Sequence, residues 1–177
     1  MHKTYERGFY GGKFLPFHKG HLFCIDTMAR QCEEAVVIFF SNSEEENEIL
    51  GQEHPVGREI LTPADRIRAI REACSRYDNV RFEILDCAVM HRKAIEEGTD
   101  PWDAETPYVM ETVGPFQAVY SSEPHYDDYF RRAYPFAAHI LVDPPRIHVP
   151  ISGTQIRNMD PEEARGWMTE PEKEKEK

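Results

Sequence analysis

Apolar and polar positions alternate along the chain in a repeating order of strand-like and helix-like segments. The first strand-like segment, "RGFYGGKF" (7–14), runs into a glycine turn. The next segment, 20–32, places apolar side chains at helical spacing, beginning with Leu22 and Ile25. It is followed by "EAVVIFFS" (34–41), an unbroken β-branched and aromatic run that is typical of a strand covered on both faces. This order predicts a parallel crossover unit.

The same order continues through the second half of the chain. The segment "TPADRIRAIREACSRY" (62–77) opens with Thr62 as an N-cap and Pro63 at the first helical position, so we predict a helix there. Further strands are predicted at 80–85, 116–122 and 139–143, and a further helix at 126–134. We therefore predict an α/β fold with a Rossmann-like, doubly wound parallel sheet.

Two segments, 42–61 and 86–115, interrupt this alternation and are predicted to be irregular. In doubly wound folds ligands bind where loops leave the carboxyl ends of the strands, so these segments are candidate substrate walls. Mobile surface loops are the alternative. The predicted organisation is one domain over 1–160, followed by a short helical and charged, flexible tail over 161–177.

Length, charge and cysteine usage narrow the class of protein. The 177 residues suffice for one self-supporting core, and neither a secretory leader nor an apolar run of membrane-spanning length is visible, which predicts a cytoplasmic protein. The net charge of −11 argues against a nucleic-acid or membrane partner, but it does not exclude a small polyanion. The cysteines lie outside any C-x-x-C spacing, so buried reduced thiols are predicted at Cys24, Cys32, Cys74 and Cys87.

The stretch "GGKFLPFHKGH" carries the first candidate site. Its glycines end the first strand, Pro16 stiffens the turn, and His18 and His21 fall at the start of the following helix. The free N–H groups and the dipole of a helix N-terminus favour an anion. Gly20 has no side chain and leaves room for one. We expect a phosphate to be bound here.

A metal site is the alternative interpretation of two histidines three residues apart. No carboxylate or third histidine stands at a recognisable spacing from His18 and His21, so we predict no metal site. A P-loop is also excluded, because the pattern G-x-x-x-x-G-K-[ST] is absent from the sequence.

A second candidate site is "PISGTQIR" (150–157), which follows the last predicted strand. It offers the hydroxyl groups of Ser152 and Thr154 beside Gly153 at a second predicted helix start, with Arg157 one turn into the helix. Hydroxyls, amides and a guanidinium group together hold phosphate oxygens. Taken alone, the segment is equally an ordinary capped helix, but its pairing with the first site favours phosphate binding.

The two motifs, G-x-F-x-P-x-H-x-G-H and I-S-x-T-x-I-R, resemble those of the H-x-G-H nucleotidyltransferase superfamily. Within it the chain is most similar to nicotinamide-mononucleotide adenylyltransferases, particularly the adenylyltransferase domain of the bacterial bifunctional transferase and ribosylnicotinamide kinase. The stretches "LTPADRIRAIRE", "SSEP" and "VDPPRIHVPISGTQIR" extend the resemblance over nearly all of the chain. A kinase domain is not among the predicted features.

The resemblance implies specific roles for residues. It implies catalytic roles for His18, His21 and Arg157. The ATP-binding residues that it implies are Gly12, Lys13, Phe14, Pro16, Lys19, Gly20, Ser122, Glu123, Ser152, Gly153 and Thr154. For the acceptor we name Trp102, which stacks on the pyridine ring or else packs its own loop, and also Arg66 and Tyr108. Arg146 is a further candidate contact, and the default role for Arg66 or Arg68 is an ion-paired or solvated arginine.

The implied reaction joins the AMP moiety of ATP to nicotinamide mononucleotide, giving NAD and pyrophosphate, with Mg²⁺ accompanying the ATP. Two alternatives stay open. One is nucleotidyl transfer to another phosphate acceptor, such as phosphopantetheine or, with CTP, an alcohol phosphate. The other is a nucleotide sensor without turnover. The oligomeric state also stays open, with a homo-oligomer as one alternative.

Overall fold

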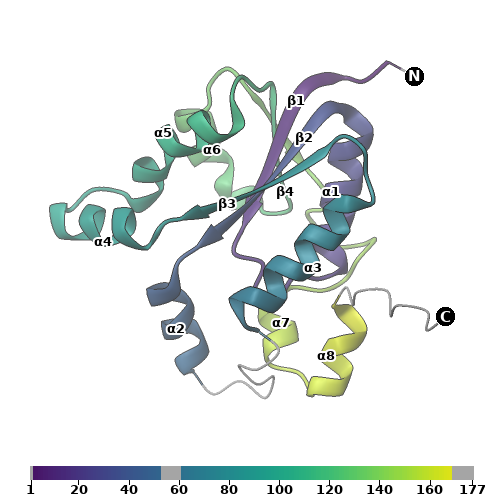
Figure 1. Cartoon of the computed structure of the whole chain (residues 1–177), viewed down its shortest axis with the longest axis vertical. Coiled ribbons are helices and arrows are strands. Elements are labelled where there is room, and N and C mark those ends of the chain that lie inside the picture. The colour runs from purple at the N-terminus through teal and green to yellow at the C-terminus, as the bar shows by residue number, and fades with distance from the viewer. Residues whose placement is uncertain (1, 53–60, 169–177) are drawn as a thin grey trace.

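A parallel β-sheet forms the centre of the protein. The computed structural model describes residues 2–52 and 61–168. The strands found there are β1 (Tyr5–Gly12), β2 (Cys32–Ser41), β3 (Val80–Asp86), β4 (Ala118–Ser121) and β5 (Ala138–Leu141). They lie in the order β3-β2-β1-β4-β5, and every neighbouring pair is parallel (Figure 1). The predicted doubly wound sheet is confirmed.

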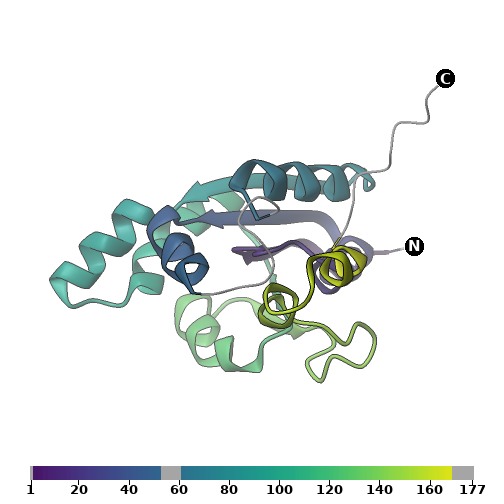
Figure 2. The ribbon, with the colours of Figure 1, turned by 90° about the horizontal axis from the view of Figure 1, so that it is seen from below.

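Helices cover both faces of this sheet. The helices α1 (Lys19–Gln31) and α3 (Pro63–Ser75) pack on one face, in a cluster that includes Ile25 and Ile70. The helices α5 (Pro101–Val113) and α6 (Asp127–Ala133) pack on the other, in a cluster that includes Val109 and Tyr129. Figure 1 shows α1 and α3 on one side of the strands and α5 and α6 on the other, and Figure 2 shows the same ribbon from below. The chain changes face between β3 and β4, so β1 and β4 flank the switch point of the fold.

Local sequence explains the elements that were predicted. Val36, Val37 and Ile38 of β2 are 0% exposed, as expected for a strand with helices on both faces. The Thr62 side chain caps α3 by accepting a hydrogen bond from the Asp65 N–H, and Pro63 occupies the first turn. The four cysteines are buried and unpaired, which confirms their prediction as reduced thiols.

The two segments predicted to be irregular contain helices, and that prediction is wrong. The first holds α2 (Ser43–Gly51), and the second holds α4 (Ala88–Glu97) and the whole of α5. Asn42 caps α2, and Gly98, at a left-handed φ of 70°, ends α4. The interior Pro107 of α5 obscures the helical pattern in the sequence. Residues 53–60 of the first segment lie outside the described residues.

The C-terminal part of the described chain packs against the two loops that enter α1 and α3. It contains α7 (Gly153–Arg157) and α8 (Pro161–Trp167), and Ile156 and Ala164 are both buried in a cluster with Leu15 and Leu61. The helical part of the predicted tail is therefore α8, whereas residues 169–177 lie outside the described residues. Among the described residues, no helix is long and apolar enough to span a membrane.

Candidate active site

His18 and His21 cap each other at the start of α1. The Nδ1 atom of His18 accepts a hydrogen bond from the Gly20 N–H at 3.0 Å, and Nδ1 of His21 accepts one from the His18 N–H at 3.2 Å. A ring nitrogen that accepts carries no hydrogen, so in each ring the hydrogen is on Nε2. The helix cap thus fixes both tautomers and leaves each histidine with one N–H donor that the cap does not use.

Both rings are uncharged at neutral pH. Burial, assisted by the charge of Arg146, lowers the pKa of His18 to about 3. Burial also lowers the pKa of His21 well below its usual value, with further contributions from His18 and Arg146. The centroids of the two rings lie 3.7 Å apart, and an edge contact with Phe14 at 4.9 Å adds to the packing around His21. The histidines therefore offer hydrogen-bond donors rather than positive charges.

Gly20 makes room for the His18 ring. A Cβ atom at Gly20 would lie 2.8 Å from Cε1 of His18, which is closer than carbon atoms approach one another without strain. The predicted role of Gly20, to leave room for a phosphate, differs from its place in the structure, where the imidazole ring of His18 fills that space. Phe14, just before the cis Leu15–Pro16 peptide, has a left-handed φ of 50°. A tightly folded loop thus sets the histidines at the end of β1.

Arg157 joins the second motif to the first. Its Nη1 atom donates to the Leu15 carbonyl at 2.7 Å, and its Nη2 atom donates to Thr154 Oγ1 at 3.2 Å. Ser152 caps α7 by accepting a hydrogen bond from the Gln155 N–H at 3.2 Å. Within the described residues, Nε of Arg157 is the buried side-chain nitrogen that has no hydrogen-bond partner. Burial also lowers the pKa of this guanidinium group, so an anion beside it would be stabilised.

A cavity of about 400 Å³ opens at the carboxyl ends of β1, β2 and β4, where both motifs meet. It therefore lies at the switch point of the sheet, as expected for a ligand site in this type of fold. The predicted site residues that line it are Gly12, Lys13, Phe14, His18, Gly20, His21, Trp102, Ser122, Glu123, Ser152, Gly153, Thr154 and Arg157.

Four predicted site residues, Pro16, Lys19, Arg66 and Tyr108, do not line the cavity. Pro16 is buried behind it, whereas Lys19 and Tyr108 are exposed elsewhere. Arg66 is 2% exposed, and its guanidinium group contacts Glu46 at 2.7 Å, the Leu61 carbonyl at 3.1 Å and the Lys13 carbonyl at 2.9 Å. Arg66 therefore holds the loop after β1 in place instead of facing the cavity.

Several cavity residues carried no assigned role in the sequence reasoning. Arg146, which we named only as a candidate contact, donates to the Ile151 carbonyl at 2.8 Å and pairs with Glu123. The others include Asn42, Cys87, His91, Glu105, Tyr126 and Tyr129. Cys87 and His91 are four residues apart and Trp102 and Glu105 three apart, which is the spacing of one helix face. That spacing is the signal in the sequence for a helical wall of the cavity, and the interior Pro107 of α5 obscures it.

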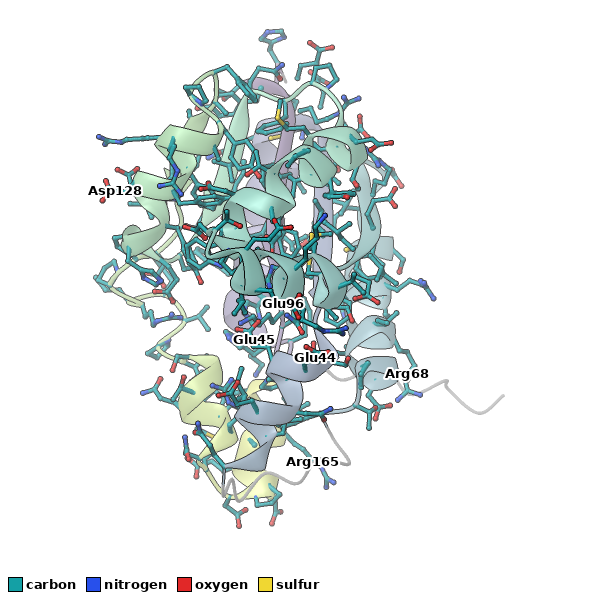
Figure 3. The ribbon with its side chains drawn as sticks, turned by 90° about the vertical axis from the view of Figure 1, so that its left-hand side faces the viewer. Glu44, Glu45, Arg68, Glu96, Asp128 and Arg165 are labelled. Carbon is teal, nitrogen blue, oxygen red and sulfur yellow. The ribbon has the colours of Figure 1, made fainter. Side chains whose placement is uncertain are left out.

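The cavity has two chemically different ends. At one end lie the phosphate-type donors of His18, Arg157 and the α7 start. At the other end Trp102, Tyr126 and Tyr129 form edge contacts with ring centroids 5.0–5.2 Å apart, beside Glu105. Figure 3 shows Glu44, Glu45 and Glu96 near one another, where α2 faces α4, and Glu45 also lines the cavity. A ligand with an anionic centre and aromatic rings suits this arrangement.

Comparison with known proteins agrees with this geometry. A family profile described as cytidylyltransferase-like matches residues 9–159. The chain is 28% identical to a nicotinamide-nucleotide adenylyltransferase of Methanocorpusculum labreanum over 152 residues, which cover 86% of this chain and 77% of that protein. It is 37% identical to a probable nicotinate-nucleotide adenylyltransferase of Desulfotalea psychrophila over 75 residues, which cover 42% of this chain and 31% of that protein.

Solved structures share the fold. A NadR protein in complex with NAD and AMP-PNP superposes with a TM-score of 0.63 at 20% identity, over 93% of this chain and 45% of that one. A bifunctional NMN adenylyltransferase/ADP ribose pyrophosphatase from Francisella tularensis gives a TM-score of 0.61 at 18% identity, over 94% of this chain and 45% of that one. The present chain thus spans less than half the length of these proteins, and at such identities the likeness shows the fold.

Proposed function

The chain belongs to the cytidylyltransferase-like family, a nucleotidyltransferase family, and from that premise we propose that it transfers the adenylyl group of ATP to nicotinamide mononucleotide. The products are NAD and pyrophosphate. The observation that carries this proposal is the convergence of the two motifs on one cavity, where the buried Nε of Arg157 has no partner of its own. Such a donor is satisfied by an anionic oxygen of a bound nucleotide.

In this reaction the 5′-phosphate of the mononucleotide attacks the α-phosphorus of ATP in line, and pyrophosphate leaves. The attacking phosphate is already an anion, so the step needs no general base. Catalysis consists of positioning the two phosphates and stabilising the charge that moves onto the leaving group. We assign that stabilisation to the Nε2–H donors of His18 and His21 and to the guanidinium group of Arg157.

The two ends of the cavity fit the two parts of this reaction. We assign the triphosphate to the end formed by Ser152, Thr154 and Arg157, and the pyridine ring to the end formed by Trp102. A cationic pyridinium ring is stabilised by the negative charge of Glu105 beside Trp102, whereas the neutral adenine ring gains little from it.

Mg²⁺ is proposed to enter with ATP. The carboxylate at the phosphate end is Glu123, which is already paired with Arg146. A single paired carboxylate fits an ion that is held mainly by phosphate oxygens and water, as Mg²⁺ prefers, and the bound ion would neutralise triphosphate charge.

The cytoplasmic location, the homo-oligomer and the exclusion of nucleic-acid and membrane partners stay predictions from the sequence.

The test is NAD formation from ATP, Mg²⁺ and nicotinamide mononucleotide, followed with a coupled dehydrogenase. Nicotinate mononucleotide, phosphopantetheine and CTP with alcohol phosphates are assayed alongside for pyrophosphate release.

We expect His21→Gln to lower kcat by about 10²- to 10³-fold, because glutamine keeps the helix cap but not the ring donor. His148→Gln, an exposed residue outside the cavity, is the matched control. Binding of ATP without pyrophosphate release from any acceptor would establish the sensor alternative instead.

A further inference from the structure

Helix α5 presents Trp102 and Glu105 to the aromatic end of the cavity. The two residues are three positions apart and therefore share one helix face. The Tyr129 hydroxyl donates to the Trp102 carbonyl at 2.8 Å, which ties the first turn of α5 to α6. Trp102 is 38% exposed, so part of its ring is open to a ligand, whereas Glu105 is 9% exposed. A carboxylate thus stands at a fixed place beside an accessible aromatic ring.

The carboxylate of Glu105 is held by His91 in a defined tautomer. Asn42 caps α2 through Oδ1, which accepts from the Glu45 N–H at 3.2 Å, so its amide nitrogen faces Nδ1 of His91 at 3.0 Å. An amide nitrogen only donates, and Nδ1 of His91 therefore carries no hydrogen. The hydrogen is on Nε2, which contacts Glu105. His91 is consequently a neutral donor, and the pair of His91 and Glu105 keeps the negative charge of the carboxylate.

Among the described residues, no lysine or arginine forms an ion pair with Glu105. Lys13 is the lysine that lines this cavity, and it is paired with Glu45. Burial raises the pKa of Glu105, whereas the electrostatic and hydrogen-bond interactions with His91, a hydrogen bond with Cys87 and the charge of Lys13 oppose the rise. A buried carboxylate acts on a neighbouring charge more strongly than an exposed one, because little water screens it.

We propose that Glu105 selects the amidated pyridine nucleotide against its acid form. The proposal rests on the proposed function and names the residue that sets the acceptor specificity of the same site. The carboxamide of nicotinamide mononucleotide is uncharged and can donate a hydrogen bond to Glu105, whereas nicotinate mononucleotide would bring a second carboxylate to the same place. Repulsion of like charges is an effective means of rejecting a close analogue.

The experiment compares kcat/KM for nicotinamide and nicotinate mononucleotides, with saturating ATP at mildly alkaline pH, which favours the ionised form of the Glu105 carboxyl group. We expect the wild-type protein to prefer the amide and Glu105→Gln to lower that preference about 10- to 100-fold, mainly through the acceptor KM. The KM for ATP should not change. The matched control is Glu111→Gln, which removes the same charge from an exposed position of α5 outside the cavity.

The outcomes separate this proposal from the proposed function. If the wild-type protein adenylylates neither mononucleotide, the proposed function fails. If it makes NAD but prefers the acid form, or if Glu105→Gln keeps the wild-type preference, the role of Glu105 is refuted while the function stands. A wild-type preference for the acid form refutes the role of Glu105 even if the variant folds poorly. The possible ligand atoms of Cys87, His91 and Glu105 also lie close enough together to hold one metal ion. A stoichiometric transition metal that is lost in Cys87→Ser would make Glu105 a ligand and refute the proposal.

Discussion

At the scale of single residues, the start of α1 is unusual because two imidazole rings form the reciprocal cap that serine and glutamate or glutamine usually form. The cap requires both Nδ1 atoms to accept, and the cavity receives both Nε2–H groups as donors. Protonation would place a hydrogen on Nδ1 and abolish the cap. The same rings therefore link the stability of the helix start to the donors offered to a ligand.

Stability of the ligand-free protein should consequently fall in mild acid. The pKa of His18 is 6.5 in the unfolded chain and about 3 in the folded protein, so between these values the unfolded chain binds more protons. This contribution is complete above pH 6.5 and is lost as pH falls towards 3, at about 1.4 kcal/mol per pH unit. Urea unfolding at several pH values between 7 and 5 measures it.

The control for this measurement is His18→Asn, because asparagine caps a helix without titrating. We expect the free energy of unfolding of the variant to depend less steeply on pH than that of the wild-type protein. Equal slopes would show that folding does not lower the pKa of His18.

At the scale of elements, the sequence predicts the sheet better than the wall of the cavity. Runs such as 34–41 are apolar enough to identify buried strands. Motif residues such as His18 fall at the start of the helix that follows a strand. Helices α4 and α5 escaped prediction because their apolar faces are interrupted by residues that serve the cavity and by Pro107. Trp102 and Glu105 are therefore placed by the structure alone.

Helices α2 and α3 are joined by a buried ion pair, Arg66 with Glu46, with side chains 2% and 4% exposed. Arg66→Met should lower the free energy of unfolding by about 3 to 5 kcal/mol, because it leaves the Glu46 carboxylate buried without its partner. Arg68→Met is the control, since the pair of Arg68 with Asp65 is exposed and should contribute at most about 1 kcal/mol. Urea denaturation of both variants measures the difference. Similar losses in the two variants would contradict this ranking.

At the scale of the whole molecule, the contact between Arg157 and the Leu15 carbonyl brings the two motifs together. ATP should therefore stabilise the folded protein, by about 2.7 kcal/mol at a concentration 100 times its Kd. Arg157→Lys should reduce this gain at a fixed ATP concentration, because lysine lacks the planar fork that holds the carbonyl and a phosphate together. Thermal unfolding with and without ATP is the measurement. The control is Arg165→Lys at an exposed position on α8, which should be stabilised by ATP as much as the wild-type protein. If ATP stabilises Arg157→Lys as much as the wild-type protein, Arg157 is excluded from the nucleotide site.

The contact between Leu15 and Arg157 spans 142 positions of the chain. On the ribosome, the first motif therefore emerges long before the residues that complete its cavity. Until the segment after β5 has left the exit tunnel, a nascent chain has the two histidines but no arginine to join them, and the proposed ATP site is incomplete. Pairings this distant also form late and slowly, since a long loop must close first. Nucleotide bound as proposed would therefore stabilise the chain only after Arg157 has joined Leu15.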